Sequence, residues 1–129
     1  MILEGDTWSG SHDRGWEKSN PSLDDIRDAV ARLDGRTFTE VVVRTEDRLR
    51  YLSVAGGPDL FLVTGELEDA SLLHLLSRDQ NDSLVSLVCG GQQADFRRFE
   101  LVQRGVALDA VSNFLNGFPN GIDGNWLVE

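Results

Sequence analysis

The sequence predicts an α+β protein in which two helices pack on one face of a mainly antiparallel sheet. Three observations lead to this fold class. Apolar residues recur at helical spacing over 23–33, β-rich runs separated by short turns fill 37–64, and a second helical pattern follows at 106–116. The chain has 129 residues without a linker or an internal repeat, so we expect one domain spanning residues 1–129.

The first helix has the clearest pattern. Its start has two compatible interpretations: Asn20 as the cap followed by Pro21, or Ser22 as the cap in a variant capping box with Asp25. Gly35 supplies the stop. The apolar face consists of Leu23, Ile26, Val30 and Leu33.

The residues before this helix are harder to interpret. Ile2 and Leu3 favour a short edge strand. The segment 5–15 is rich in Gly, Ser and Asp and is typical of a loop, with Trp8 inside it and Trp16 just beyond it.

The next segments favour strands. Residues 37–45 are dense in β-branched side chains, 46–47 form a turn, and 49–54 alternate in part. The run 56–59, Gly-Gly-Pro-Asp, indicates a hairpin or loop, and 60–64 is a third strand. Because a parallel crossover needs a dozen or more residues, the short spacing predicts an antiparallel meander.

Residues 71–77 fit either two turns of helix or a strand. We interpret them as a strand that pairs with a buried strand at 83–89 across a turn at 79–82. Gly90 and Gly91 then let the chain leave that strand through a tight turn.

The second helix covers about 106–116 and is capped by Gly117. Asn120-Gly121 and Asp123-Gly124 are turn signals in the tail, and a short strand is expected at 126–128. The apolar face of this helix consists of Ala107, Leu108, Val111, Phe114 and Leu115.

Composition and charge restrict the class of partner. A hydrophobic content of 40% with 26% charged residues is that of an ordinary soluble protein. The 22 acidic residues outnumber the 12 basic ones, which gives a net charge of −10. Such a protein repels nucleic acid and anionic membranes and attracts basic surfaces. The alternative that the acidity only aids solubility stays open.

Several features favour a cytoplasmic protein. No apolar run approaches the roughly 20 residues of a membrane span, and the N-terminus lacks the pattern of a signal peptide. Cys89 is the only cysteine, so there is no disulfide framework. Its place in an apolar run predicts a buried, unreactive thiol.

We find no motif for catalysis or for a cofactor. His12 and His74 are the only histidines, and neither has a second His or Cys at ligand spacing. Phosphate-binding loops and the Gly-x-Ser-x-Gly elbow are absent. We therefore predict no metal, no cofactor, no catalytic residue and no enzymatic activity, although sequence alone never excludes a Ser–His–Asp triad.

Acidic clusters and two tryptophans remain as candidates for contact with a partner. Carboxylates suit a basic partner, and partly exposed aromatic residues are frequent interface anchors. The alternatives are that the carboxylates are only solvated and that the tryptophans cap the core. The predicted partner-binding residues are Trp8, Asp13, Trp16, Glu66, Glu68, Asp69, Asp79 and Asp82.

Several segments together resemble the immunity protein 1 family of bacterial polymorphic toxin systems. The similarity runs from about Pro21 to Trp126 and is best from Val85 onward. A first helix ending in Leu-Asp-Gly, an aromatic–Leu–x–Val strand before Gly-Gly, an apolar strand before Gly-Gly-Gln, and a helix with Phe near its end followed by tryptophan all carry it. The matching segments are 33–35, 51–57, 87–92, 107–114 and Trp126.

This resemblance implies an α+β protein that binds a cognate toxin and occludes its active site. Toxins associated with the family include nucleic-acid deaminases and nucleases, whose clefts are basic. It further implies a monomer or a 1:1 complex with the toxin domain. Two other hypotheses stay open: a small acidic interaction or regulatory module without a toxin partner, and an unrecognised enzyme with His12 or His74 in a polar pocket.

Overall fold

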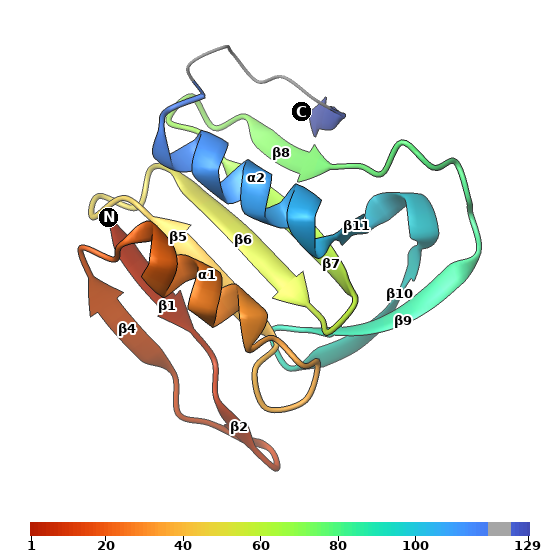
Figure 1. Ribbon diagram of the computed structural model, residues 1–129, viewed down its shortest axis with the longest axis horizontal. Coiled ribbons are helices and arrows are strands. Elements are labelled where there is room, and N and C mark those ends of the chain that lie inside the picture. The colour runs from red at the N-terminus through yellow and green to blue at the C-terminus, as the bar shows by residue number, and fades with distance from the viewer. Residues whose placement is uncertain (119–124) are drawn as a thin grey trace.

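The computed structural model describes residues 1–118 and 125–129 and has the predicted α+β fold (Figure 1). Seven strands form the main antiparallel sheet in the order β12-β8-β7-β6-β5-β1-β4, and β11 (Val102–Gln103) pairs with the free start of β7. The seven are β1 (Ile2–Gly5), β4 (Trp16–Ser19), β5 (Glu40–Arg44), β6 (Tyr51–Gly56), β7 (Leu60–Glu66), β8 (Leu72–Leu75) and β12 (Trp126–Val128).

Two small hairpins stand beside this sheet. One consists of β2 (Trp8–Ser9) and β3 (His12–Asp13), and the other of β9 (Leu84–Cys89) and β10 (Gln92–Arg97). A single turn of 3₁₀ helix, η1 (Arg98–Glu100), connects the second hairpin to β11.

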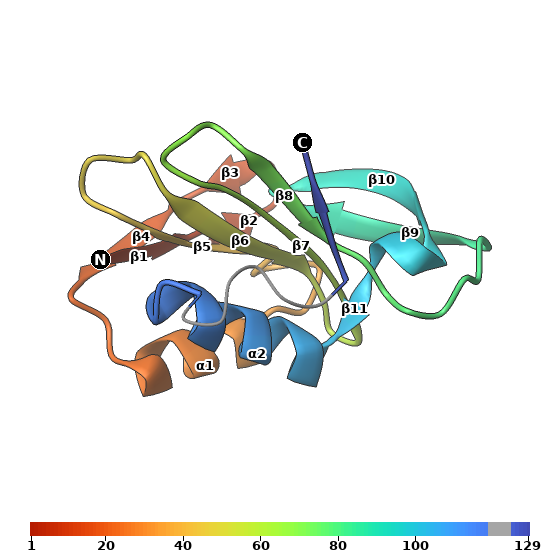
Figure 2. The same cartoon turned by 90° about the horizontal axis from the view of Figure 1, so that it is seen from above.

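The two helices, α1 (Leu23–Ala31) and α2 (Arg104–Leu115), lie together on one face of the sheet, as predicted (Figure 2). The sheet residues that meet them are almost all apolar and buried, and Phe61 and Phe114 are the largest side chains that are fully buried. No helix in the described part of the chain is long and apolar enough to cross a membrane.

Ser22 is the cap of α1, which decides between the two predicted starts. Its hydroxyl accepts from Asp25 N at 3.1 Å, and Asp25 Oδ2 accepts from Ser22 N at 2.8 Å. These hydrogen bonds, together with Lys18 at 3.0 Å, lower the pKa of Asp25. Asn20 instead adopts a left-handed conformation with φ of 52° outside the helix.

The predicted meander is confirmed, since β5, β6, β7 and β8 pair in sequence order. The strand preference of 71–77 is confirmed as β8, and that of 126–128 as β12. Gly117 has φ of 70°, as its predicted cap role requires. The turn signals Asn120-Gly121 and Asp123-Gly124 lie outside the described residues.

Four local predictions are wrong. Ile2 and Leu3 lie in β1, which is not an edge strand. It pairs with β4 on one side and with β5 on the other. The 5–15 segment is not a plain loop, because it contains the β2–β3 hairpin, which turns the chain back to form β4.

The third error concerns the partner of 71–77. β8 pairs with β7 and β12, whereas β9 pairs with β10 across the two-residue turn Gly90-Gly91. Because the turn is so short, β10 is closer to β9 along the chain than β8 is, and β10 becomes its partner. The strand expected at 83–89 is also not buried as predicted. Leu87 is its only buried residue, because the hairpin packs against the rest of the protein along one side.

Candidate functional site

The main sheet has a second face, opposite the helices, which we call the open face. Residues directly opposed in neighbouring antiparallel strands carry side chains on the same face. The pairing therefore places one row of such side chains across seven strands of the open face. In order from β4 to β12, this row is Glu17, Glu4, Val42, Ser53, Thr64, His74 and Leu127.

The β9–β10 hairpin crosses one end of the sheet on the side away from the helices (Figure 2). Leu87 packs against the end of β6, where a side-chain carbon on Gly56 would lie 2.2 Å from Leu87 Cδ2. The hairpin turn reaches β5, because Gly90 faces the Glu40 carboxylate. The hairpin thus borders the open face where β6 ends.

A buried carboxylate, Asp6, holds the two hairpins against the sheet. Its oxygens accept from Thr39 N at 2.7 Å, Glu40 N at 3.1 Å, Trp8 Nε1 at 2.7 Å and the Thr39 hydroxyl. That hydroxyl in turn accepts from Gly91 N at 2.9 Å. We call Asp6, Trp8, Thr39 and Gly91 the hairpin junction.

Trp8 completes this junction through packing. Its ring lies so close to Gly91 that a side-chain carbon there would be 2.1 Å from Trp8 Cζ2. Gly91 also has φ of 80°, which favours glycine. The close approach of the indole and the left-handed turn therefore both require glycine at this position.

Next to the junction, the open face contains a hollow of about 620 Å³ with a strongly acidic lining. We call it the acidic hollow. Five carboxylates and a single guanidinium line it, so its potential is negative. They are Glu4, Asp6, Asp13, Glu17 and Glu40, with Arg48.

Glu40 lies at the base of the acidic hollow. Burial raises the pKa of its carboxyl, and the nearby Asp6 and Glu4 raise it further, while a hydrogen bond from Ser53 Oγ at 3.1 Å opposes them. An incoming cation would relieve this repulsion.

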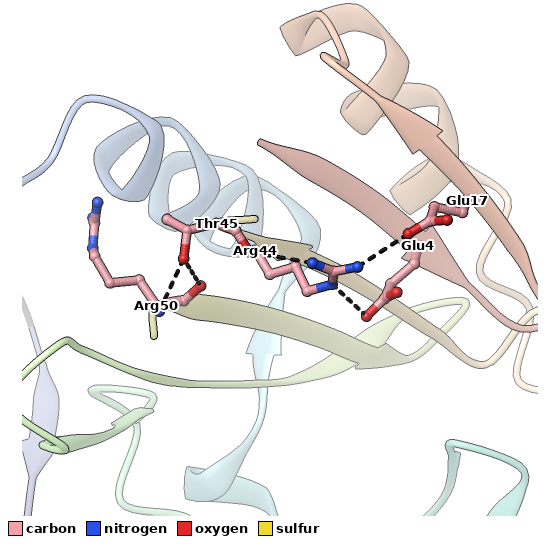
Figure 3. A network of polar contacts seen from close by, with 5 residues as sticks. All are labelled: Glu4, Glu17, Arg44, Thr45 and Arg50. Atoms are coloured by element: carbon pink, nitrogen blue, oxygen red, sulfur yellow. Dashed lines mark hydrogen bonds and ion pairs between the residues drawn. The ribbon is translucent and has the colours of Figure 1, made fainter. Parts of the chain in front are cut away.

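Arg44 orders the rim of the acidic hollow (Figure 3). Its side chain is only 5% exposed, with Nε 3.2 Å from Glu4 Oε1 and an Nη donating to Glu17 Oε1 at 3.0 Å. Its other Nη donates to the Thr45 carbonyl at 3.2 Å. Because the guanidinium is held from three sides, it fixes both glutamates while leaving part of their charge exposed.

Cys89 lies near Glu40 at the end of β9. The thiol is half-buried, and burial together with Glu40 raises its pKa to about 11. Since the thiolate is the reactive form, this thiol is inert at neutral pH. The burial of Cys89 is thus less complete than predicted, while its low reactivity agrees with the raised pKa.

The opposite end of the open face carries exposed leucines among polar side chains. A shallow hollow of about 330 Å³ there, the apolar hollow, lies over β6, β7, β8 and β12. Leu72 is 49% exposed and Leu127 is 45% exposed. The lining consists of Tyr51, Thr64, Gly65, Leu72, Leu73, His74, Leu127 and Glu129.

Of the predicted partner-binding residues, Asp13 and Trp16 line the acidic hollow. Asp13 Oδ1 accepts from Thr7 N at 2.9 Å and Gly15 N at 2.8 Å. Trp16 packs mainly against the core, with Arg32 stacked 5.3 Å from its ring, and Trp8 is held in the hairpin junction. Both indoles pack within the protein, as in the alternative weighed for them, and their contact with a partner stays a prediction.

The other predicted acids do not join this hollow. Glu66, Glu68 and Asp69 lie at the β7–β8 turn, where Glu68 is 3.5 Å from Arg50 and Asp69 accepts from Ser71 N. Asp79 and Asp82 lie in the β8–β9 connection, at the opposite end of the sheet (Figure 1).

Asp79 borders a third hollow of about 540 Å³ between α2 and the end of β8. Its charges are balanced, with Arg78 and Arg98 against Asp79 and Asp109. This hollow therefore has no net attraction for a basic partner.

Sequence reasoning missed Glu4, Glu17, Glu40 and Arg44. They come from three strands and meet only through the pairing of β4, β1 and β5. The sequence did contain a signal for them. Glu4 and Asp6 occupy alternate positions, and in 40–44 the charged residues Glu40 and Arg44 alternate with the buried Val41 and Val43.

The histidines are far apart in the fold. His12 is exposed at the tip of the β2–β3 hairpin, and His74 Nε2 is 3.0 Å from the Glu100 carbonyl. Among residues 1–118 and 125–129, no three His, Cys, Asp or Glu side chains are placed to hold a metal ion.

Comparisons with known proteins give no match for this chain, whether with family models, with curated proteins or with solved structures.

Proposed function

We propose that this protein is an immunity protein that binds a basic toxin domain through its open face and blocks the toxin's active site. The observation that carries the proposal is the acidic hollow, which is lined by five carboxylates, of which Asp6 is buried in the hairpin junction. The resemblance of the 87–92 and 107–114 segments and of Trp126 to the immunity protein 1 family supports the same proposal.

The physical basis is competition for a cationic cleft. A nuclease or deaminase that grips nucleic acid presents Lys and Arg side chains to phosphates, and carboxylates held on a rigid sheet can take their place. A net charge of −10 steers the encounter, with association rates of about 10⁸–10⁹ M⁻¹s⁻¹ at low salt. The protein acts by binding alone, in the cytoplasm that it protects.

The test is coexpression with the toxin encoded beside this gene, scored by survival and by copurification of a 1:1 complex. We expect rescue, a complex that survives gel filtration, and an affinity that falls as salt rises. No complex at micromolar concentrations, or rescue without binding, would overturn the proposal.

Charge variants locate the surface. Glu17→Gln with Glu40→Gln keeps the side-chain shapes and removes two charges from the acidic hollow. We expect the complex to weaken at least tenfold, mostly through slower association. The matched control is Asp24→Asn with Asp28→Asn, which removes the same charge from the exposed side of α1. An equal loss in both double variants would mean that only net charge matters, and the open face would not be the interface.

A further inference from the structure

The apolar hollow shares the open face with the acidic hollow, but the charge argument does not explain it. Leu72 and Leu127 are about half exposed there, on neighbouring strands, and Tyr51 lies beside them. Tyr51 also belongs to the open face, since it is paired with Arg44 on one side and Glu66 on the other. Exposed apolar side chains grouped in a hollow are typical of a binding surface.

A row of small side chains lies between the two hollows. Val42, Ser53 and Thr64 occupy the row between Glu4 and His74. No side chain in this row is larger than valine. Val42 and Thr64 are partly exposed, whereas Ser53 is buried and its hydroxyl donates to Glu40 at 3.1 Å. From β1 to β12 there are five strand spacings, or about 24 Å. About seven residues of extended chain cover that distance.

We propose that the open face binds one extended segment of the partner, basic at the end over the acidic hollow and apolar at the end over Leu72 and Leu127. This inference rests on the proposed function and specifies the chemistry of the toxin surface that is recognised. The basic end is set by charge complementarity with Glu4, Glu17 and Glu40. The apolar end is set by Tyr51 and the two leucines.

A second copy of this chain does not fit the same face. Each copy carries a net charge of −10, so two copies repel each other, and neither offers a cationic surface to the acidic hollow of the other through this face. The occupant must therefore supply cations that this face lacks.

The first experiment selects nine-residue peptides from a random display library on the immobilised protein. We expect enriched peptides with Arg or Lys at one end and Leu, Phe or Trp at the other. Amide shifts mapped by NMR with one such peptide are expected at both ends together, at Glu40–Val42 and at Leu72 and Leu127. Selection of no binder, or shifts confined to one end or to the helices, would overturn the inference.

The second experiment uses the toxin domain with neutral variants of the apolar hollow. Leu72→Ser with Leu127→Ser is expected to raise the dissociation rate at least tenfold and to leave the salt dependence of binding unchanged. The matched control is Leu49→Ser with Leu84→Ser, which changes leucines that are 55% and 61% exposed and do not line the apolar hollow.

These outcomes separate the two proposals. If the toxin binds the Leu72→Ser, Leu127→Ser variant as tightly as the parent protein, the inference fails and the immunity function stands. If the toxin does not bind the parent protein at all, the proposed function fails, whatever the peptides show.

Discussion

The two faces of the main sheet are built from the same strands and held by different forces. On the helix side, one row of strand residues faces the helices and is nearly inaccessible to solvent. It consists of Val41, Val54 and Val63. On the open side, polar groups are positioned by defined hydrogen bonds, as Arg44 is by Glu4 and Glu17.

This difference separates stability from recognition within single strands. In β5, Val41 and Val43 serve the core while Glu40 and Arg44 face the candidate site. A change at the buried positions should therefore alter mainly the unfolding free energy, and a change at the open-face positions should alter mainly partner binding. The predictions below test this separation.

The largest effect is expected from Phe114→Ala on the helix side. Phe114 is completely buried between α2 and the sheet, and loss of a buried aromatic ring costs about 3–5 kcal/mol. Urea unfolding monitored by circular dichroism measures it. The matched change on the open face, Leu127→Ala, should cost under about 1 kcal/mol, because that side chain is 45% exposed. Equal costs would contradict the division between the faces.

Gly91→Ala should have the next largest effect, through the hairpin junction. The new methyl would meet the Trp8 ring, and φ of 80° disfavours alanine. Overpacking and backbone strain together predict a loss of about 2–4 kcal/mol in the free energy of unfolding. The same variant should displace Gly90 from Glu40 and weaken toxin binding.

The control for this change is Gly105→Ala, in the first turn of α2. A side-chain carbon there meets nothing within 4 Å, so alanine should stabilise the protein by about 0.5 kcal/mol. If Gly91→Ala is equally well tolerated, the close approach of Trp8 is not a feature of the protein in solution.

The smallest effect concerns the pH dependence of stability. Burial opposes ionisation of Asp34, but hydrogen bonds from Phe38, Arg36 and Thr37 N–H groups outweigh it and lower its pKa below the ordinary 3.8. The unfolded chain then binds protons more readily, so this contribution to stability is lost as pH falls below about 4.

Glu40 has the opposite sign. Its raised pKa means that the folded state holds the proton more tightly, so stability falls as pH rises through that pKa. Urea unfolding between pH 3 and pH 7 should show a reduced acid loss in Asp34→Asn and a relative gain at neutral pH in Glu40→Gln. Identical pH profiles for both variants and the parent would contradict these assignments.

Local features were predictable from sequence where a few adjacent residues decide the conformation. Ser22 and Asp25 begin α1 by bonding each other, and the strands of the meander follow one another through short turns. The pairing of β4 with β1, and of β9 with β10 instead of β8, depends on contacts between distant segments. Periodicity within one segment carries no information about its neighbour.

The candidate site was largely unpredictable for the same reason. Glu4, Glu17 and Glu40 are isolated acids in the sequence, and only the sheet register brings them together. The cluster that stands out in sequence, Glu66, Glu68 and Asp69, lies at the end of β7 and in the turn after it, where charged residues favour solvent.

The hairpin junction has a consequence for the timing of folding. It joins residues 6, 39 and 91, so it is complete only after 91 of the 129 residues have been made. Contacts of such long sequence separation form late, because a long loop must close first. A ribosome-bound chain that lacks the second hairpin should therefore have no competent binding surface. Under the proposed function, toxin binding would begin only once the second hairpin has been made, after a delay set by translation rather than by diffusion.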